Sequence, residues 1–174
     1  MEAPAITRNR EIKMTIRPLI PTDVKQILDV YNGYILTSTA TFEETPLDLE
    51  SFATRVKRIT DSYPFLVAEE NGKIAGYAYL DRFNERSAYR KTADLSIYLD
   101  PDFKGKGLGR KLLAELENAG RKIGITQIVS LVTEENTVSR AFHLACGFRE
   151  VGTLTEVGEK FGKKLGVTYF QKSI

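Results

Sequence analysis

A glycine-rich loop between a strand-like segment and an amphipathic helix constrains the fold of this chain more than any other feature. Residues 93–99 alternate in the manner of a strand, and the loop Asp100–Gly109 that follows contains three glycines. Apolar residues then recur at helical spacing from Leu108 to Ile123. Glycines leave main-chain N–H groups accessible, and the positive end of a helix favours negative charge beside them. The segment therefore predicts a cradle for an anion, most often a phosphate.

Known phosphate-binding patterns narrow the choice of ligand. The P-loop needs four residues between its first glycine and a Gly-Lys-Ser/Thr run, and this chain has no such run. The dinucleotide pattern Gly-x-Gly-x-x-Gly fails because its third glycine falls on Arg110 when it starts at Gly105 and on Leu112 when it starts at Gly107. The spacing Lys-x-x-Gly-x-Gly over residues 104–109 remains. Considered alone, a tight surface turn with solvated lysines explains it equally well.

A second patterned segment follows a strand-like run at Gln127–Thr133. Residues 136–146 have a helical pattern, and Gly147 is suited to end the helix before a strand that starts at Phe148. One face of this helix carries apolar side chains, namely Val138, Ala141, Phe142 and Ala145. Another face carries the polar side chains Asn136, Ser139, Arg140 and His143.

Together the two segments resemble the motifs of GNAT acetyltransferases. The acetyl-CoA pyrophosphate loop of that family reads Arg/Gln-x-x-Gly-x-Gly/Ala, and this chain departs from it only at Lys104. The Asn136–Phe148 segment looks like the later motif that lines the pantetheine arm. The run Tyr89–Tyr98 is similar to the Tyr-Arg-x-Thr-Val-Glu-x-Ser-Val-Tyr run of the phosphinothricin-type subgroup. Thr39–Pro46 and Val157–Gly162 also fit that subgroup, so the likeness extends over nearly the whole chain.

The resemblance implies a fold class, a cofactor and the residues that hold it. The fold would be α/β (α+β), with a mixed sheet of about seven strands that splays at the acetyl-CoA site and about four flanking helices. Acetyl-CoA would be the acetyl donor, and no metal is expected. The implied cofactor-binding residues are Ile97, Tyr98, Leu99, Lys104, Gly105, Lys106, Gly107, Leu108, Gly109, Arg110, Asn136 and Ser139.

Acetyl transfer from a thioester to an amine requires a neutral amine, a donor for the developing oxyanion and a proton for the departing thiolate. Asp94 is the candidate base, because the family carries a glutamate at the matching strand position. Its shorter side chain leaves room for a bridging water, and Glu43 and Glu44 are weaker alternatives. His143 is the candidate general acid. Cys146 has no required role, so we expect a structural thiol.

The substrate-binding residues follow from the need to hold a small amino-acid-like amine. Arginine suits a carboxylate because it binds bidentately, and Arg82 and Arg90 precede the Asp94 strand. Phe42 and Glu43 belong to the loop expected beside the substrate. The chain departs from the subgroup at Gly162–Gly166, where Gly-Arg-Trp-x-Asp is usual, and it contains no tryptophan. Phosphinothricin itself is therefore a weak expectation.

Composition and length set the remaining expectations. We expect one domain at residues 14–174, preceded by a flexible extension at 1–13. A net charge of +2, one cysteine and the absence of a long apolar run favour a cytoplasmic protein that binds neither nucleic acid nor membrane. The family's habit implies a homodimer. The predicted function is an N-acetyltransferase of a small primary amine; alternatives are acetylation of a protein N-terminus or polyamine, or an acyl-CoA sensor without turnover.

Overall fold

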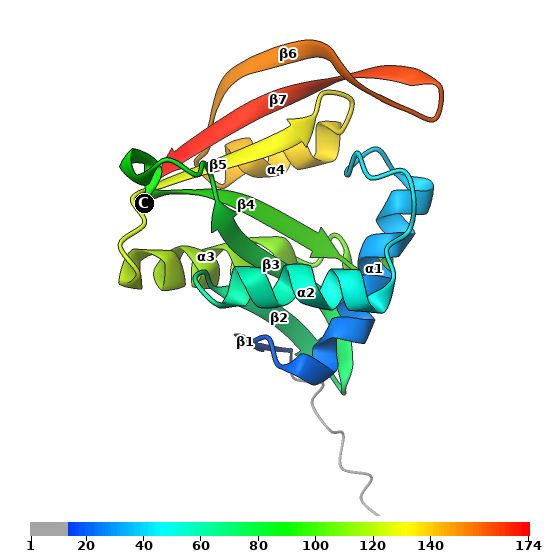
Figure 1. Cartoon of the computed structure of the whole chain (residues 1–174), viewed down its shortest axis with the longest axis vertical. Coiled ribbons are helices and arrows are strands. Elements are labelled where there is room, and N and C mark those ends of the chain that lie inside the picture. The colour runs from blue at the N-terminus through cyan, green and yellow to red at the C-terminus, as the bar shows by residue number, and fades with distance from the viewer. Residues whose placement is uncertain (1–13) are drawn as a thin grey trace, which may run out of the picture.

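A seven-stranded mixed sheet runs through the computed structural model, which describes residues 14–174 (Figure 1). The strand order is β1-β2-β3-β4-β5-β7-β6. All neighbouring strands are antiparallel except β4 and β5, which are parallel. The extension predicted at 1–13 lies outside the described residues. The strand bounds are β1 Thr15–Pro18, β2 Phe65–Glu70, β3 Lys73–Arg82, β4 Thr92–Leu99, β5 Gln127–Thr133, β6 Arg149–Lys160 and β7 Lys163–Ser173.

Four α-helices cover the two faces of this sheet. Helices α1 (Val24–Thr37) and α2 (Leu49–Thr60) pack on one face around a cluster that includes Ile27, Val56 and Tyr77. On the other face lie α3 (Leu108–Lys122) and α4 (Thr137–Ala145), and α3 buries its leucines against a second cluster. These leucines repeat every three to four residues, which is why one side of α3 is apolar. No helix within residues 14–174 is long and apolar enough to cross a membrane.

The resemblance-based fold class is confirmed, and most element positions are close to the expected ones. The C-terminal strands go beyond the sequence-based expectation, which was a strand starting at Phe148: β6 and β7 form a long hairpin over Arg149–Lys160 and Lys163–Ser173. Its turn is Phe161-Gly162, with positive φ at both residues. β6 is an edge strand with irregular register and mostly exposed side chains, so it lacks the apolar alternation from which a strand is predicted.

Helix α4 buries a different face from the apolar one that its pattern would place against the core. Val138 is 80% exposed, and Ala141 and Ala145 are also exposed. His143 is buried instead, with its ring 5.1 Å from that of Phe148 and 5.2 Å from that of Phe170. The imidazole can take a core position because both of its nitrogens find hydrogen-bond partners there.

Candidate active site

The parallel strands β4 and β5 stay together for only three residues. Thr92–Asp94 pair with Gln127–Val129, and beyond Asp94 the strands diverge (Figure 1). The remainder of β4, Leu95–Leu99, stays paired with β3 on its other side. The strands therefore diverge as the resemblance predicted, and we call the opening between them the splay. Along it, in the part of the chain that the structure describes, one edge of β4 has no strand partner.

Main-chain donors face that unpaired edge. The N–H of Asp100 donates to Ala75 O, toward β3. Because successive residues of an antiparallel strand turn their N–H groups to opposite sides, Ile97 and Leu99 present theirs to the splay. Leu99 O turns the same way and accepts a 2.7 Å hydrogen bond from the Tyr34 hydroxyl. Tyr98 instead packs its ring on Tyr31 and Tyr34, with centroids 5.2 Å away in each pair.

The glycine loop delivers the amino end of α3 to the end of β4. Gly105 and Gly107 have φ of 76° and 75°, a conformation that side chains disfavour, and Gly107 caps α3 with no side-chain hydrogen bond. The first N–H groups of a helix have no partner within it. They are therefore available to an anion, as the sequence predicted. A Cβ at Gly105 or Gly107 would contact no protein atom, so backbone conformation rather than crowding explains these two glycines.

Gly109 has a different reason to be glycine. A Cβ there would lie 3.2 Å from the ring of Phe142 on α4 and 3.7 Å from Leu99 on β4. This tight contact joins the start of α3 to α4. A larger residue at 109 would push the cradle away from the helix across the splay.

The predicted cationic residues of the loop surround the cradle. Lys104 and Arg110 are exposed, as is Lys106. The Lys104 ammonium lies 4.8 Å from the ring centroid of Tyr34, and that of Lys106 lies 5.2 Å from Phe103. Both lysines therefore hold their charge near the cradle by packing on aromatic faces. The first-turn donors, the two glycines with positive φ and this positive charge fit a pyrophosphate.

On the opposite side of the splay, Asn136 caps α4. Its Oδ1 accepts a 3.1 Å hydrogen bond from Ser139 N, so the carbonyl end of the amide is engaged. The Nδ2 end makes no hydrogen bond within residues 14–174. This geometry suits the expectation that Asn136 donates to an extended ligand, while Ser139 contributes through the helix start.

Asp94 occupies the point where β4 and β5 part. In the part of the chain that the structure describes, its Oδ1 is the one buried side-chain oxygen or nitrogen without a hydrogen-bond partner. Burial, followed by the nearby carboxylate of Asp81, raises the pKa of Asp94 to about 7. Asp81 lies directly opposite on β3 and is held by Arg58 of α2, at 3.0 and 2.6 Å. Asp94 is therefore poised to gain or lose a proton near neutral pH.

His143 is buried in a very different manner. Its Nδ1 lies 2.7 Å from Ser139 O and its Nε2 lies 2.8 Å from Ser130 Oγ. A carbonyl oxygen only accepts, so Nδ1 carries the hydrogen and, in the neutral ring, Nε2 accepts from the Ser130 hydroxyl. Burial lowers the pKa of His143, although the carbonyl of Ser139 opposes this. The geometry is that of a structural histidine, and its assignment as the general acid stays a prediction.

The face of β4 that carries Asp94 also carries the loop between α1 and α2. Tyr31 of α1 hydrogen-bonds the hydroxyl of Thr41 at 2.9 Å. Glu43 forms a 2.7 Å ion pair with the half-buried Arg55, whose guanidinium lies over the ring of Tyr31. Phe42 packs on β6, where a Cβ at Gly158 would overlap its ring. Glu43 is thus an ion-pair partner, which makes it a weak alternative to Asp94 as a base.

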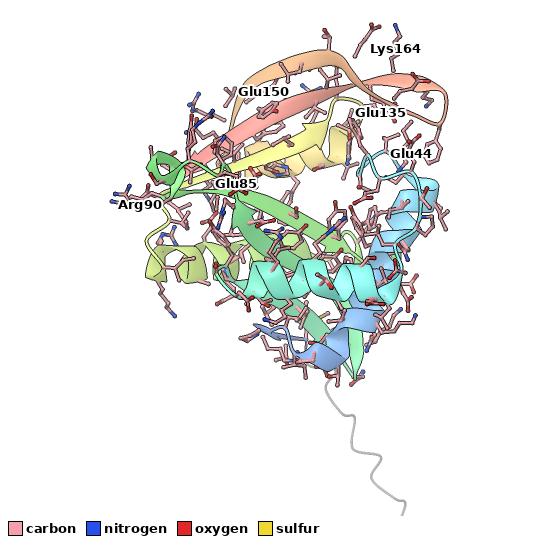
Figure 2. The ribbon with its side chains drawn as sticks, viewed as in Figure 1. Glu44, Glu85, Arg90, Glu135, Glu150 and Lys164 are labelled. Atoms are coloured by element: carbon pink, nitrogen blue, oxygen red, sulfur yellow. The ribbon has the colours of Figure 1, made fainter. Side chains whose placement is uncertain are left out.

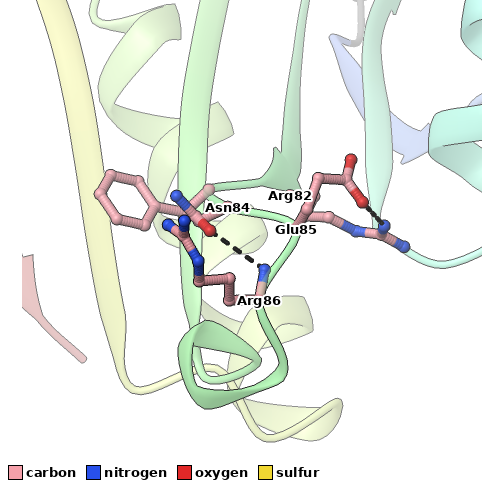
Figure 3. Close-up of a pocket in the computed structure, with 5 residues that line it drawn as sticks. Arg82, Asn84, Glu85 and Arg86 are labelled. Atoms are coloured by element: carbon pink, nitrogen blue, oxygen red, sulfur yellow. Dashed lines mark hydrogen bonds and ion pairs between the residues drawn. The ribbon is translucent and has the colours of Figure 1, made fainter.

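The structure does not bring Arg82 and Arg90 together with Phe42 and Glu43. Figure 2 shows Arg90 and Glu85 at the end of the sheet away from Glu44. Arg82 is exposed and pairs with Glu85 at 2.6 Å, within a shallow pocket lined only by residues 82–86 (Figure 3). Since Asp81 shares the face of Asp94, Arg82 starts on the other face of the sheet. Both arginines stay predicted substrate residues.

Several residues around the site carry no sequence signal of their own. Asp81 is the exception: the register of the β3–β4 pair would have placed it opposite Asp94, and two carboxylates in such a pair raise each other's pKa. Ser130, Arg55 and Lys160 could not, because serine, arginine and lysine at these positions are typical of solvent-facing residues.

Comparison with known proteins supports this geometry. The Acetyltransferase (GNAT) family model matches residues 27–148. A phosphinothricin N-acetyltransferase from Alcaligenes faecalis is 38% identical over 162 residues, covering 92% of this chain and 82% of that protein. An L-methionine sulfoximine/L-methionine sulfone acetyltransferase from Salmonella typhimurium is 35% identical over 159 residues, covering 91% and 93%.

A solved structure shows the same architecture with the cofactor bound. The GNAT superfamily phosphinothricin acetyltransferase from Sinorhizobium meliloti, in complex with acetyl-CoA, matches with a TM-score of 0.89 and 36% identity, covering 92% of this chain and 88% of that one. The family resemblance predicted from the glycine loop and the Asn136 segment is confirmed. The cradle, the splayed strands and these matches show that the chain belongs to the GNAT family and is an N-acetyltransferase.

Proposed function

We propose that this enzyme transfers an acetyl group from acetyl-CoA to the primary amine of a small amino-acid-like substrate. The observation that carries the proposal is Asp94, a half-buried carboxyl group with one buried, unpartnered oxygen and a pKa of about 7, at the point where the strands part. The names of the two relatives, which act on phosphinothricin and on methionine sulfoximine or sulfone, support the substrate class.

The residues at the splay would bind the cofactor, accept the proton of the amine, and donate a hydrogen bond to the developing oxyanion. Bound acetyl-CoA would supply the acetyl thioester, with its pyrophosphate at the first turn of α3 and its arm beside Asn136 and Ser139. Asp94 would accept the proton that the substrate ammonium must lose before it can attack. The N–H of Ile97 or Leu99 would donate to the oxygen on which negative charge develops. His143 could return a proton to the sulfur only as the imidazolium and only through Ser130, because Nδ1 is engaged with Ser139 O: Nε2–H would donate its proton to Ser130 Oγ while the Ser130 hydroxyl gives its own proton to the sulfur.

A substrate with a carboxylate needs a fixed cation as well. Arg55 lies on α2 one turn before Arg58, which contacts Asp81 on the Asp94 rung of the sheet. Its present partner is the Glu43 carboxylate. In addition to Arg82 and Arg90, we propose Arg55 as a candidate residue for binding the substrate carboxylate.

A thiol-release assay tests the proposed function. The amines would be phosphinothricin, methionine sulfoximine, methionine sulfone, common amino acids, a polyamine and short peptides. We expect turnover with at least one amino-acid-like amine. Turnover with peptides or polyamine alone would overturn the substrate class. Acetyl-CoA binding without turnover on any amine would favour a sensor.

We also propose a symmetric homodimer. Its support is the edge strand β6, which has no strand neighbour on one side within residues 14–174 and exposes Val151, Leu154 and Val157 by about half. Sedimentation at micromolar concentration should give twice the monomer mass; a monomer would contradict it.

A further inference from the structure

A buried lysine joins the α1–α2 loop to the C-terminal hairpin. Lys160, at the end of β6, is 2% exposed, although lysine is almost never fully buried without a partner. Its Nζ donates to Ser38 O and Thr41 O, at 2.8 Å each. Both acceptors are neutral main-chain carbonyls, and burial lowers the pKa of Lys160, opposed by the charges of Glu44 and Glu43.

The segment that Lys160 holds reaches both sides of the splay. At the β5 side, Thr133 Oγ1 donates to Thr39 O at 2.5 Å, and Thr39 Oγ1 donates to Glu135 at 2.7 Å. At the β4 side, Thr41 contacts Tyr31, whose ring packs on Tyr98. Figure 2 shows Glu135 and Glu44, at the end of β5 and in the loop, in the same region of the molecule.

The far end of the loop is fastened separately to the first half of the chain. The Asn32 side chain both donates to Leu47 O and accepts from Leu47 N, at 3.0 and 2.9 Å. Glu43 is held by Arg55. Ser38 and Thr41 also contact α1, through Tyr34 O and the Tyr31 hydroxyl. The remaining contacts of Ser38–Phe42 are with β5 and β6, and Lys160 makes the most buried of these.

We propose that Lys160 is a positioning residue for the amine substrate: it fixes the Ser38–Phe42 segment across the splay and so sets where Phe42 and Glu43 stand beside the acceptor site. The role of the segment at the acceptor rests on the proposed function. The attachment of the segment to Lys160 does not, and it can be measured without any substrate.

The test compares Lys160→Met with Lys164→Met, which makes the same change on the same hairpin at an exposed lysine. Hydrogen exchange of peptides covering residues 38–47 should accelerate in Lys160→Met only, with the start of α3 unchanged. The KM for the amine should rise about ten- to a hundredfold, the range that a misplaced substrate causes, while the acetyl-CoA KM changes little. Unchanged exchange in the loop would overturn the proposal, and so would equal rises in both KM values.

Thr133→Val serves as a second variant in case Lys160→Met does not fold. It removes only the hydroxyl that holds Thr39 O, so the same changes should appear at smaller size. A lower Tm with unchanged amine KM in both variants would mean a purely structural role and would overturn the proposal. If no amine in the panel is acetylated by the wild type, the proposed function fails, and loop exchange still decides whether Lys160 holds the segment.

Discussion

The two sides of the splay bury their titratable groups in opposite ways. On the β4 side, Asp94 has an oxygen without a partner, and its pKa is raised to about 7. On the β5 and α4 side, both nitrogens of His143 are hydrogen-bonded and three phenylalanine rings surround it. Burial favours the neutral form of both groups. Burial with partners therefore makes a stable core group, whereas burial without them leaves a group ready for proton transfer.

The largest expected effect tests the β4 side. Asp94→Asn should lower kcat by about 10²- to 10⁴-fold, the usual contribution of a general base, with little change in acetyl-CoA Kd. Asp94→Glu should retain most activity, because it restores the family's usual side chain. In the wild type, kcat/KM should rise with pH through about 7 as Asp94 ionises. A dead Asp94→Glu beside an active Asp94→Asn would contradict the base assignment.

The sequence could predict one side of the splay better than the other. The cradle and Asp94 are local features, since a glycine loop after a strand and a carboxylate on that strand are visible in consecutive residues. The surroundings of His143 are not local: Ser130 lies on β5, Phe170 on β7 and Phe148 directly before β6, and these three residues reverse the face that α4 was expected to bury. The burial of Lys160 and the full length of β6 could not be predicted either, because long-range contacts stabilise this otherwise polar strand.

The second effect tests the contact that joins the two sides. Gly109→Val should raise the acetyl-CoA Kd about ten- to a hundredfold, because overpacking against Phe142 costs about 1–3 kcal/mol and displaces the cradle. Lys104→Ala, measured by the same calorimetric titration, should raise it only about twofold if main-chain donors carry the binding. The reverse order of effects would refute the main-chain cradle.

The third effect tests the α4 side. If the engaged imidazole is structural, His143→Ala should lower kcat less than about tenfold and should lower Tm clearly, through the cavity that it leaves. If His143 is instead the acid, kcat should fall about ten- to a thousandfold and recover as pH falls. Ser130→Ala, which removes the partner of Nε2, should follow His143→Ala in either case.

The smallest effect is on stability. The pKa of Asp94 is about 7 in the folded protein and about 4 in the unfolded chain, because the folded state holds the proton more tightly. The protein therefore loses stability as the pH rises from about 4 to 7. Asp94→Asn removes this cost, so its Tm should exceed that of the wild type at pH 8, by about 2–4 °C for each kcal/mol relieved. The difference should shrink toward pH 4. An equal difference at both pH values would show that folding does not raise the pKa of Asp94.

The short seam between β4 and β5 has a consequence for how this protein unfolds. Residues 127–174 form a contiguous unit of three extensively paired strands, and the four preceding strands form another, yet the sheets of the two units meet only over Thr92–Asp94 and Gln127–Val129. Side chains also join the two units, in the apolar cluster that holds Ile128 and Phe170 with Leu112 and in the bonds of Lys160 and Thr133. Few main-chain hydrogen bonds do, however, and units joined in this way can open separately. We therefore expect the free protein to denature in two transitions. Acetyl-CoA, bound between β4 and α4, would couple the two units, so the two transitions should merge into one when it is present.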